Sequence, residues 1–339
     1  MALQSPLALT LGEPAGIGPD ITLKAWQARK EQQIPPFYLI GDPQFIKRRA
    51  RHLGLDVAVV SVDPHEAVAA FNEHLPVVPL DTSITAEPGQ PDNTSAPAAI
   101  AAIKRAVSDV LAGRASAIVT NPIAKSVLYR EGFSDPGHTE YLARLTREST
   151  GAISQPVMML WSPALAVVPV TVHIPLSQVV DCLTVDLLVT TARIVAHDMR
   201  ERFGIAQPRL LCAGLNPHAG EEGTLGREEN DVIAPALDIL RREGIAIRGP
   251  VSADTMFHAR AREGYDAALC MYHDQALIPI KTLAFDEAVN VTLGLPFVRT
   301  SPDHGTAFDI AGTGRADPSS LIAALKLADR LARTQSPKG

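Results

Sequence analysis

The sequence predicts an α/β protein of two domains, in which mainly parallel sheets are covered by helices. Short apolar runs alternate along the chain with longer segments whose apolar residues recur at helical spacing. This alternation is typical of parallel sheets with helical crossovers. The chain has 339 residues, which is more than one hydrophobic core usually organises, so two domains of roughly 150 residues are expected.

The expected strands are short, apolar and bounded by residues that favour turns. The first runs into a segment rich in glycine and proline, and a helix should start near Asp20. Asn121-Pro122 should end a later strand, because proline cannot donate to a strand ladder. In chain order, the expected strands are Leu7–Leu11, Phe37–Ile40, Val57–Val62, Ala117–Thr120, Val157–Trp161, Ala166–Val172, Arg209–Ala213 and Ala267–Met271.

The expected helices carry an apolar stripe with a period of about 3.6 residues. The clearest lies between Thr94 and Gly113, where the glycine suits a helix end. A second is expected between Thr184, which can cap it, and Gly204. Two more are expected later in the chain, one over Val232–Leu240 and one over Pro318–Arg333.

Composition limits the partners that this chain can have. Its formal net charge is -6 and it has no long basic run, so nucleic acids and membranes are not expected partners. The apolar run at its start is too short for a signal peptide or a spanning helix. Its cysteines, Cys182, Cys212 and Cys270, are isolated and should be reduced. A globular cytoplasmic protein is therefore expected.

Three histidines follow three separate expected strands. These are His173, His218 and His273. Ligands collect at the carboxyl ends of parallel strands, and three imidazoles with one open position make a catalytic metal site. The alternative is that they are ordinary polar loop residues, since their spacings match no compact zinc motif. The residues alone leave both interpretations open.

Glycines follow the first strand, but not in the pattern of a dinucleotide fold. Gly12, Gly16 and Gly18 form GxxxGxG with Pro14 inside it, instead of GxGxxG, and the chain has no GxxxxGK[ST] phosphate loop. A tight turn between strand and helix is the better interpretation. The sequence therefore does not predict a Rossmann domain.

A second glycine-rich segment spans residues 304–318 and contains Gly305, Asp309 and Gly312. It resembles the adenosine-binding loop of isocitrate and isopropylmalate dehydrogenases, which bind NAD(P) without a Rossmann domain. Its glycines permit close backbone approach, and its aspartate offers a carboxylate. The alternative is a loop that only leads into the last helix, because Pro318 follows directly.

Nearly the whole chain, from Leu9 to about Leu331, resembles the 4-hydroxythreonine-4-phosphate dehydrogenase family of pyridoxal phosphate biosynthesis. Long motifs in a fixed order carry the resemblance. They are GEPAGIGP at residues 12–19, TNPIAK at 120–125, GHTEYLA at 137–143, VTVHIPL at 170–176, GLNPHAGEEGTLGREE at 214–229, ADTMF at 253–257, MYHDQALIPIK at 271–281 and NVTLGLPFVRTSPDHGTAFDIAG at 290–312.

The resemblance implies a site and an assembly. In that family three histidines bind one divalent ion, and the matching residues are His173, His218 and His273. The resemblance also implies a homodimer with a shared site, so that these histidines meet across the dimer interface. The ion could be Zn, Mg, Co or Mn, and the cofactor NAD or NADP. The implied substrate-binding residues are His138, Thr139, Lys281, Asn290 and Arg299.

The resemblance further implies the fold of isocitrate and isopropylmalate dehydrogenases, with two α/β/α domains. We expect residues 1–130 with about 265–339 to form a discontinuous domain on the cofactor side. Residues about 131–264 should form the second, carrying substrate, metal and dimer contacts. Gly305, Asp309 and Gly312 are the expected cofactor-binding residues.

The implied reaction oxidises 4-phosphooxy-L-threonine to a β-keto acid, which decarboxylates to 3-amino-2-oxopropyl phosphate. Asp254, Asp274 and Lys281 are alternative catalytic bases, and Asp274 could instead orient its neighbour His273. Two other functions stay open: the same chemistry on a related phosphorylated four-carbon acid or an aromatic cis-dihydrodiol, and a non-catalytic metal- or phosphate-binding protein.

Overall fold

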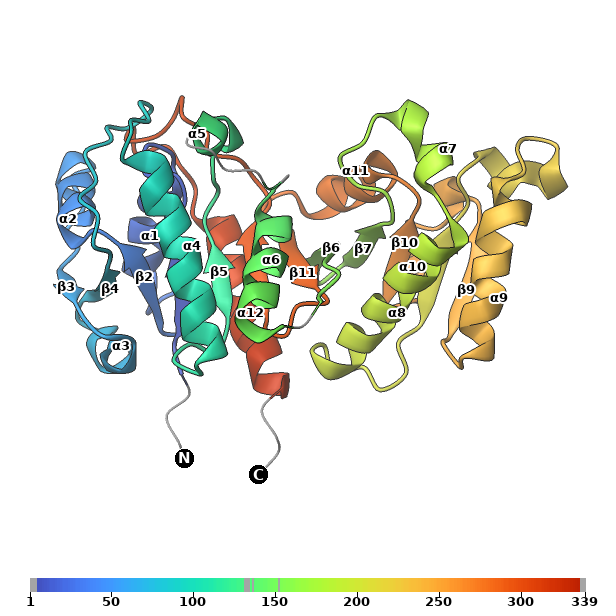
Figure 1. The fold of residues 1–339 in the computed structure, drawn as a ribbon, viewed down its shortest axis with the longest axis horizontal. Coiled ribbons are helices and arrows are strands. Elements are labelled where there is room, and N and C mark those ends of the chain that lie inside the picture. The colour runs from blue at the N-terminus through green and yellow to red at the C-terminus, as the bar shows by residue number, and fades with distance from the viewer. Residues whose placement is uncertain (1–4, 131–134, 136, 152, 336–339) are drawn as a thin grey trace. The chain divides into compact units, whose positions relative to one another are not determined.

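A computed structural model describes residues 5–130, 135, 137–151 and 153–335. Contacts divide the chain into two compact units. The first comprises Met1–Pro156 and Leu295–Ser336, and the second is Val157–Gly294. Strands alternate with helices in both units (Figure 1), which confirms the α/β class. The described helices are all too short or too polar to cross a membrane.

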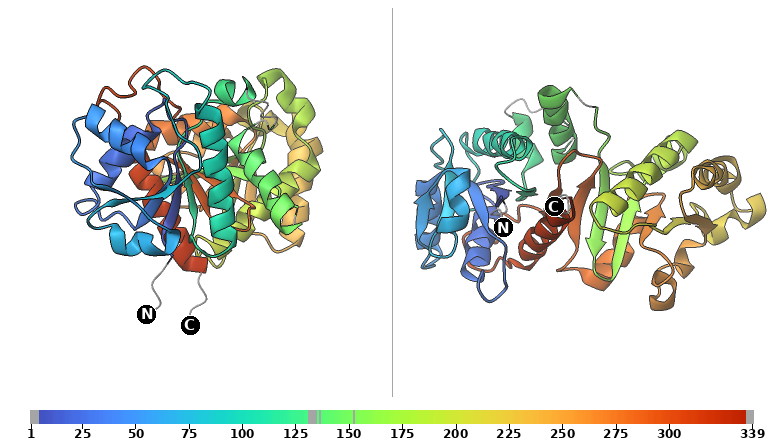
Figure 2. Two further views of the ribbon diagram at one scale, coloured as in Figure 1. Left: turned by 60° about the vertical axis from the view of Figure 1, so that its left-hand side comes forward. Right: turned by 90° about the horizontal axis from the view of Figure 1, so that it is seen from below.

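In the first unit the strands form a parallel sheet covered on both faces. Its order is β3-β4-β2-β1-β5-β12, and each neighbouring pair is parallel. The views in Figures 1 and 2 place α4 and α6 on one face and α1 and α12 on the other. The strands are β1 (Leu7–Thr10), β2 (Phe37–Gly41), β3 (Val59–Ser61), β4 (Leu75–Pro79), β5 (Ile118–Thr120) and β12 (Arg299–Pro302). The helices are α1 (Gly18–Gln27), α2 (Pro43–His52), α3 (Ala67–Ala70), α4 (Ser95–Leu111), α5 (Lys125–Arg130), α6 (His138–Thr150) and α12 (Ser319–Gln335).

The second unit has a mixed sheet in the order β11-β6-β7-β10-β8-β9. β6 pairs antiparallel with β11 and β7, whereas the pairs β7–β10, β10–β8 and β8–β9 are parallel. The strands are β6 (Val157–Ser162), β7 (Leu165–Pro169), β8 (Leu210–Ala213), β9 (Ile247–Val251), β10 (Ala267–Cys270) and β11 (Val289–Leu293). The helices are α7 (Val179–Cys182), α8 (Val185–Glu201), α9 (Ala234–Arg242), α10 (Ala259–Arg262) and α11 (His273–Ala284).

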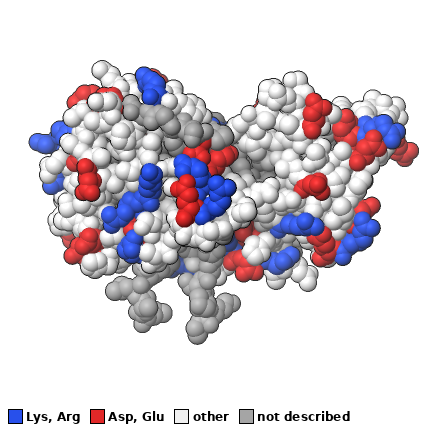
Figure 3. Space-filling view, in the orientation of Figure 1, with Lys and Arg blue, Asp and Glu red and all other residues white. Residues whose placement is uncertain are grey.

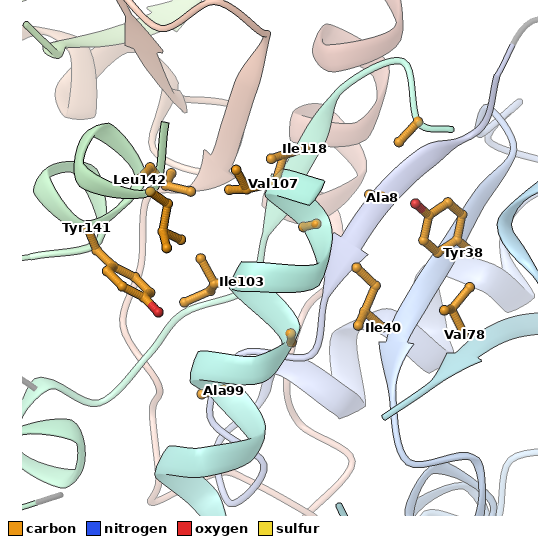
Figure 4. Close-up of a cluster of buried hydrophobic side chains, with 14 of the residues drawn as sticks. Ala8, Tyr38, Ile40, Val78, Ala99, Ile103, Val107, Ile118, Tyr141 and Leu142 are labelled. Carbon is orange, nitrogen blue, oxygen red and sulfur yellow. The ribbon is translucent and has the colours of Figure 1, made fainter. Parts of the chain in front are cut away.

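The apolar face of α4 forms the centre of the first unit's core. Ala99, Ile103 and Val107 are buried on this face, between the sheet and the side chains of Tyr141 and Leu142 on α6 (Figure 4). Small alanines along α4 allow the helix to approach the sheet closely. The helix predicted between Thr94 and Gly113 is therefore confirmed, and its apolar stripe is the reason it forms.

The second long helix confirms the predicted cap. The hydroxyl of Thr184 accepts from the backbone N–H of Leu187 at 3.2 Å, which satisfies a free N–H group of the first turn of α8. Gly204 follows the helix with a φ of 73°, a left-handed conformation that suits glycine at a helix end. The described cysteines are free: Cys212 and Cys270 are buried and Cys182 is exposed.

The compact units differ from the expected domains. We expected boundaries near residues 130 and 264, but the chain passes between units after Pro156 and after Gly294. Helix α6 packs on α4, so it belongs with the first unit. β10 pairs with β7, and β11 pairs with β6, so both belong with the second. Tertiary pairing, which the sequence does not show, sets these boundaries.

Candidate metal and substrate sites

The three histidines expected to bind a metal ion lie past the carboxyl ends of neighbouring strands in the second unit. His173 follows β7, and His273 begins α11 after β10. His218 lies in a short 3-10 segment, η3 (Pro217–Gly223), after β8. β10 pairs in parallel with both β7 and β8. The prediction that each histidine follows a strand is confirmed.

His173 and His273 lie side by side. Their ring centroids are 5.5 Å apart, and the rings are inclined by 43°. Both line a cavity of about 250 Å³, whose other lining residues are Thr171, Ile174, Leu176, Val179, Tyr272 and Asp274. His173 is exposed and His273 partly so. Two accessible imidazoles at this separation suit a divalent ion that takes nitrogen ligands.

Hydrogen bonds tie together the strand ends that carry these histidines. The backbone N–H and the hydroxyl of Thr171 both donate to the carbonyl of Met271, at 3.2 and 2.7 Å. Buried Gln275, in the first turn of α11, accepts from the Met271 N–H at 2.6 Å and donates to the Gly214 carbonyl at 2.8 Å. These bonds fix the end of β10 against the ends of β7 and β8, and so position both histidines.

Asp274 contacts His273 directly. Its Oδ1 lies 2.7 Å from Nδ1 of His273. A carboxylate on one ring nitrogen fixes the tautomer and leaves the other, here Nε2, for an ion. This contact supports the orienting role expected for Asp274.

In the described part of the chain, His218 does not complete a three-ligand group with the pair. It is exposed, and its φ of 53° is in the left-handed region. Within the described residues, no three histidine, cysteine, aspartate or glutamate side chains are arranged to hold a metal ion. The structure therefore brings together two of the three expected ligands. His173 and His273 could supply two ligands of a divalent ion, whose remaining ligands would come from other groups.

The other two candidate bases lie in different surroundings. Asp254 is exposed in a short 3-10 turn, η5 (Ala253–Thr255), where it accepts from the hydroxyl of Ser252. Lys281 lies on α11, with its Nζ 5.7 Å from the ring centroid of Phe285. The choice of base among Asp254, Asp274 and Lys281 stays open.

A buried arginine marks the candidate substrate site of the first unit. Arg299 begins β12 and is 3% exposed. Its Nη2 donates to the hydroxyl of Thr120, at the end of β5, at 2.7 Å. Burial lowers the pKa of Arg299 to about 10, and the charge of Glu140 partly opposes this shift. A guanidinium held out of water is a strong partner for an anion such as phosphate.

His138 adds an unsatisfied nitrogen near this arginine. It begins α6, and its buried Nε2 has no hydrogen-bond partner among the described residues. Burial, and then the charge of Arg299, lower the pKa of His138 well below its usual value. Its neighbour Thr139 is partly exposed in the same turn. A neutral imidazole, a hydroxyl and a buried cation can together receive an anionic group. Lys281 and Asn290 belong to the second unit.

Residues 303–317, which contain nearly all of the second glycine-rich segment and are here called the 303–317 loop, are anchored to the start of the chain. The Ile17 N–H donates to the Thr306 carbonyl at 3.0 Å, and the Gly312 N–H to Oδ2 of Asp20 at 2.7 Å. Nζ of Lys24 donates to the carbonyls of Gly314 and Ala316 at 2.6 and 2.7 Å.

These anchors leave part of the 303–317 loop open to a ligand. Gly305 and Asp309 are exposed, and a Cβ on Gly305 would meet no atom within 4 Å. A fixed backbone with an exposed carboxylate and open space beside a glycine fits the adenosine end of a dinucleotide.

Comparison with known proteins decides the family. The family model of pyridoxal phosphate biosynthetic protein PdxA matches residues 32–328. A 4-hydroxythreonine-4-phosphate dehydrogenase of Bradyrhizobium diazoefficiens is 64% identical over 98% of this chain and 98% of its own. The chain belongs to the PdxA family.

Solved structures agree with this membership. A 4-hydroxythreonine-4-phosphate dehydrogenase from Klebsiella pneumoniae has a TM-score of 0.87 and 38% identity, over 97% of this chain and 100% of its own. A terephthalate 1,2-cis-dihydrodiol dehydrogenase from Burkholderia xenovorans has a TM-score of 0.64 and 27% identity, over 97% of this chain and 98% of its own. The resemblance that the sequence motifs carry to the PdxA family is confirmed.

Sequence reasoning on this PdxA family member missed three buried polar residues. Gln275 joins strand ends. Glu229 accepts from the backbone N–H groups of Leu215 and Asn216, just before His218. Glu13, 1% exposed, has an Oε2 without a partner among the described residues, and burial raises its pKa. Each of these residues is a polar residue inside an apolar or glycine-rich motif, which is a signal that the sequence offers. The contacts that each residue makes are visible only in the fold.

Proposed function

We propose that this chain is a 4-hydroxythreonine-4-phosphate dehydrogenase. It oxidises the secondary alcohol of 4-phosphooxy-L-threonine to give 2-amino-3-oxo-4-(phosphooxy)butanoate. This β-keto acid loses CO2 to yield 3-amino-2-oxopropyl phosphate, for pyridoxine 5'-phosphate biosynthesis. The observation that carries the proposal is the 64% identity over nearly the full length to a protein of that name.

The buried cation of the first unit supports a phosphorylated substrate. Arg299, with Thr120 behind it, offers a desolvated guanidinium to the phosphate, and Nε2 of His138 is available for a further hydrogen bond. On the face drawn in Figure 3, by contrast, cationic and anionic side chains are interspersed. Phosphate recognition is therefore assigned to the buried Arg299 and the Nε2 of His138, and not to a general surface charge.

The paired histidines support a metal-assisted oxidation. His173 and His273 would hold the ion, Zn, Mg, Co or Mn, with Asp274 orienting His273. When bound, a divalent ion lowers the pKa of an alcohol so that its alkoxide becomes accessible near neutral pH. Asp254, Asp274 or Lys281 would accept the proton that the alcohol loses.

We assign the third ligand to a second copy of the chain. Among the described residues the three histidines do not form one metal-binding group, so a homodimer that shares its sites would explain a three-histidine ion. The fold type of isocitrate and isopropylmalate dehydrogenases and a cytoplasmic location are part of this proposal. NAD or NADP, when bound at the 303–317 loop, supplies the hydride acceptor; Gly305, Asp309 and Gly312 would contact its adenosine end.

The decisive assay follows NADH or NADPH formation with 4-phosphooxy-L-threonine. We expect activity that a chelator abolishes and a divalent ion restores. His273→Ala should lower kcat/KM by about a hundredfold or more, because the ion polarises the reacting alcohol. His197→Ala, an exposed histidine on α8 of the same unit, is the matched control and should change little. Full activity after chelation would disprove the metal role.

A second candidate substrate class has a specific observation in its favour. The likeness to the terephthalate dihydrodiol dehydrogenase supports the same chemistry on an aromatic cis-dihydrodiol. A related phosphorylated four-carbon acid is the other alternative substrate. The buried Arg299 favours a phosphorylated compound. Assays with 4-phosphooxy-L-threonine, 4-phospho-D-erythronate and a cis-dihydrodiol separate these classes, and the highest kcat/KM identifies the substrate.

A further inference from the structure

The loop that carries His218 has a backbone that residues with a Cβ rarely adopt. His218, Ala219, Glu221 and Glu222 have φ angles of 53°, 53°, 42° and 57°, and Gly220 between them has 80°. The left-handed conformation is disfavoured for such residues, so a run of this kind persists only where its surroundings hold it. The direction of the His218 side chain therefore depends on whatever anchors this loop.

The anchor is the carboxylate of Glu229. Only 3% of this residue is exposed, although it is charged. Its Oε1 accepts from the backbone N–H groups of Leu215 and Asn216, both at 2.8 Å, and its Oε2 accepts from the side-chain amide of Asn216 at 2.9 Å. Hydrogen bonds to a carboxylate are stronger than those between neutral groups. They fix the chain just before His218.

Glycines let this carboxylate into the loop. A Cβ on Gly220 would lie 2.6 Å from Oε2 of Glu229, and one on Gly214 would lie 3.1 Å from Oε1. The carboxylate is therefore in close contact with the loop on both sides of His218, at residue 216 and at residue 220. Glu229 itself begins a π-helical turn, η4 (Glu229–Ile233), a rare geometry that is frequent at functional sites.

We infer that Glu229 is a positioning residue for His218. It acts through the backbone of the loop: it holds the left-handed turn, and the turn aims the imidazole. This inference rests on the proposed metal role of His218. Groups that orient a metal ligand without touching the ion typically contribute ten- to a hundredfold to metal affinity or activity.

Glu229→Gln tests the inference with little change in volume. One carbonyl oxygen cannot replace both carboxylate oxygens, so either the two backbone N–H groups or the Asn216 amide lose their acceptor. We expect full-length Glu229→Gln to bind Zn²⁺ or Co²⁺ ten- to a hundredfold more weakly, by competition with a chromophoric chelator. The visible spectrum of bound Co²⁺ should also change, and raised ion concentration should restore kcat.

Glu228→Gln is the matched control. Glu228 is the preceding residue, is partly exposed, and accepts from the same Asn216 amide at 2.6 Å. Among the described residues, however, it accepts no hydrogen bond from the backbone before His218. Its ion affinity should stay within about twofold of the original, because the loop anchor remains. Equal losses in the two variants would mean that Asn216, and not Glu229, positions the loop, and would overturn the inference.

Two further variants keep the test decisive. His218→Ala is the reference: unchanged ion affinity there would refute the metal role itself. A loss in His218→Ala combined with unchanged affinity in folded Glu229→Gln would refute only the positioning role. Should Glu229→Gln not fold, Gly220→Ala displaces the carboxylate with a Cβ at 2.6 Å. The same weakening of ion binding is expected there, and retained affinity would overturn the inference.

Discussion

The two units each hold a functional loop with a buried carboxylate, but they balance its charge differently. In the first unit, Asp20 accepts from the Gly312 N–H of the 303–317 loop and pairs with Arg49 at 2.5 Å. In the second, the contacts of Glu229 to the described residues are to amide N–H groups. The first carboxylate is neutralised by a buried cation, whereas the second is held by N–H groups of the loop that it positions. Breaking the first should therefore cost stability, and altering the second should cost mainly function.

The largest effect is expected from Arg49→Met. Arg49 is 3% exposed, and besides pairing with Asp20 it donates to the carbonyls of Pro14 and Gly16. Its removal leaves a buried carboxylate without a cation, which typically costs about 3–5 kcal/mol. Urea unfolding of the purified protein should show this loss in the free energy of unfolding.

Two other variants serve as controls for Arg49→Met. Arg51→Met removes an exposed arginine from the same helix and should change stability by no more than about 0.5 kcal/mol. Glu229→Gln should cost less than Arg49→Met, because it removes a charge instead of stranding one. A cost for Arg49→Met no larger than for Arg51→Met would show that the ion pair does not anchor the first unit.

Glycine substitutions in the 303–317 loop test whether its shape serves cofactor binding. Gly312 and Gly314 both have positive φ, 72° and 76°. An added Cβ on Gly312 would lie 2.6 Å from Cβ of Pro88, whereas one on Gly314 would meet nothing within 4 Å. Both alanine variants should lose about 1–2 kcal/mol of stability from backbone strain, but only Gly312→Ala must also move the loop.

We therefore expect Gly312→Ala to weaken NAD or NADP binding by about tenfold, and Gly314→Ala to leave it nearly unchanged. Calorimetric titration of the folded variants with the cofactor measures this directly. Equal cofactor affinities in the two variants would mean that the 303–317 loop does not contribute to cofactor binding. The loop would then only connect β12 to α12.

The sequence predicted the elements whose stability is local. α4 and α8 carry their own apolar stripes and end signals, and the buried strands before His173, His218 and His273 are continuous apolar runs. The strands β4, β9, β11 and β12 were not predicted. β4 and β9 contain proline, which normally argues against a strand. β12 reads as polar, Arg-Thr-Ser-Pro, and is buried because Thr120 and the Ala324 carbonyl accept from Arg299 and Thr300.

The same limit applies to the sites. The sequence predicted that the histidines follow strands, because chain order and strand direction determine which residues lie at the carboxyl edge of a parallel sheet. It could not show that His173 and His273 meet while His218, within the part of the chain that the structure describes, does not complete a three-ligand group with them, since this depends on the strand order β7-β10-β8 and on the left-handed turn at η3. Gln275 and Glu229 act through contacts 61 and 13 or 14 residues away in sequence, which no local motif reveals.

The smallest expected effect is a change in the pH dependence of stability, caused by the buried imidazole of His138 in the first unit. Burial and the charge of Arg299 lower the pKa of His138. Below about pH 6.5 the unfolded chain takes up a proton there that the folded chain does not, so stability falls with falling pH, by at most about 1.4 kcal/mol per unit. His138→Gln should flatten this dependence in unfolding experiments between pH 7 and 5.5, whereas the exposed control His65→Gln should keep it. Identical slopes in both variants would mean that His138 is protonated as readily in the folded protein as in the unfolded chain. The imidazole beside Arg299 would then not be a neutral hydrogen-bonding group for the phosphate.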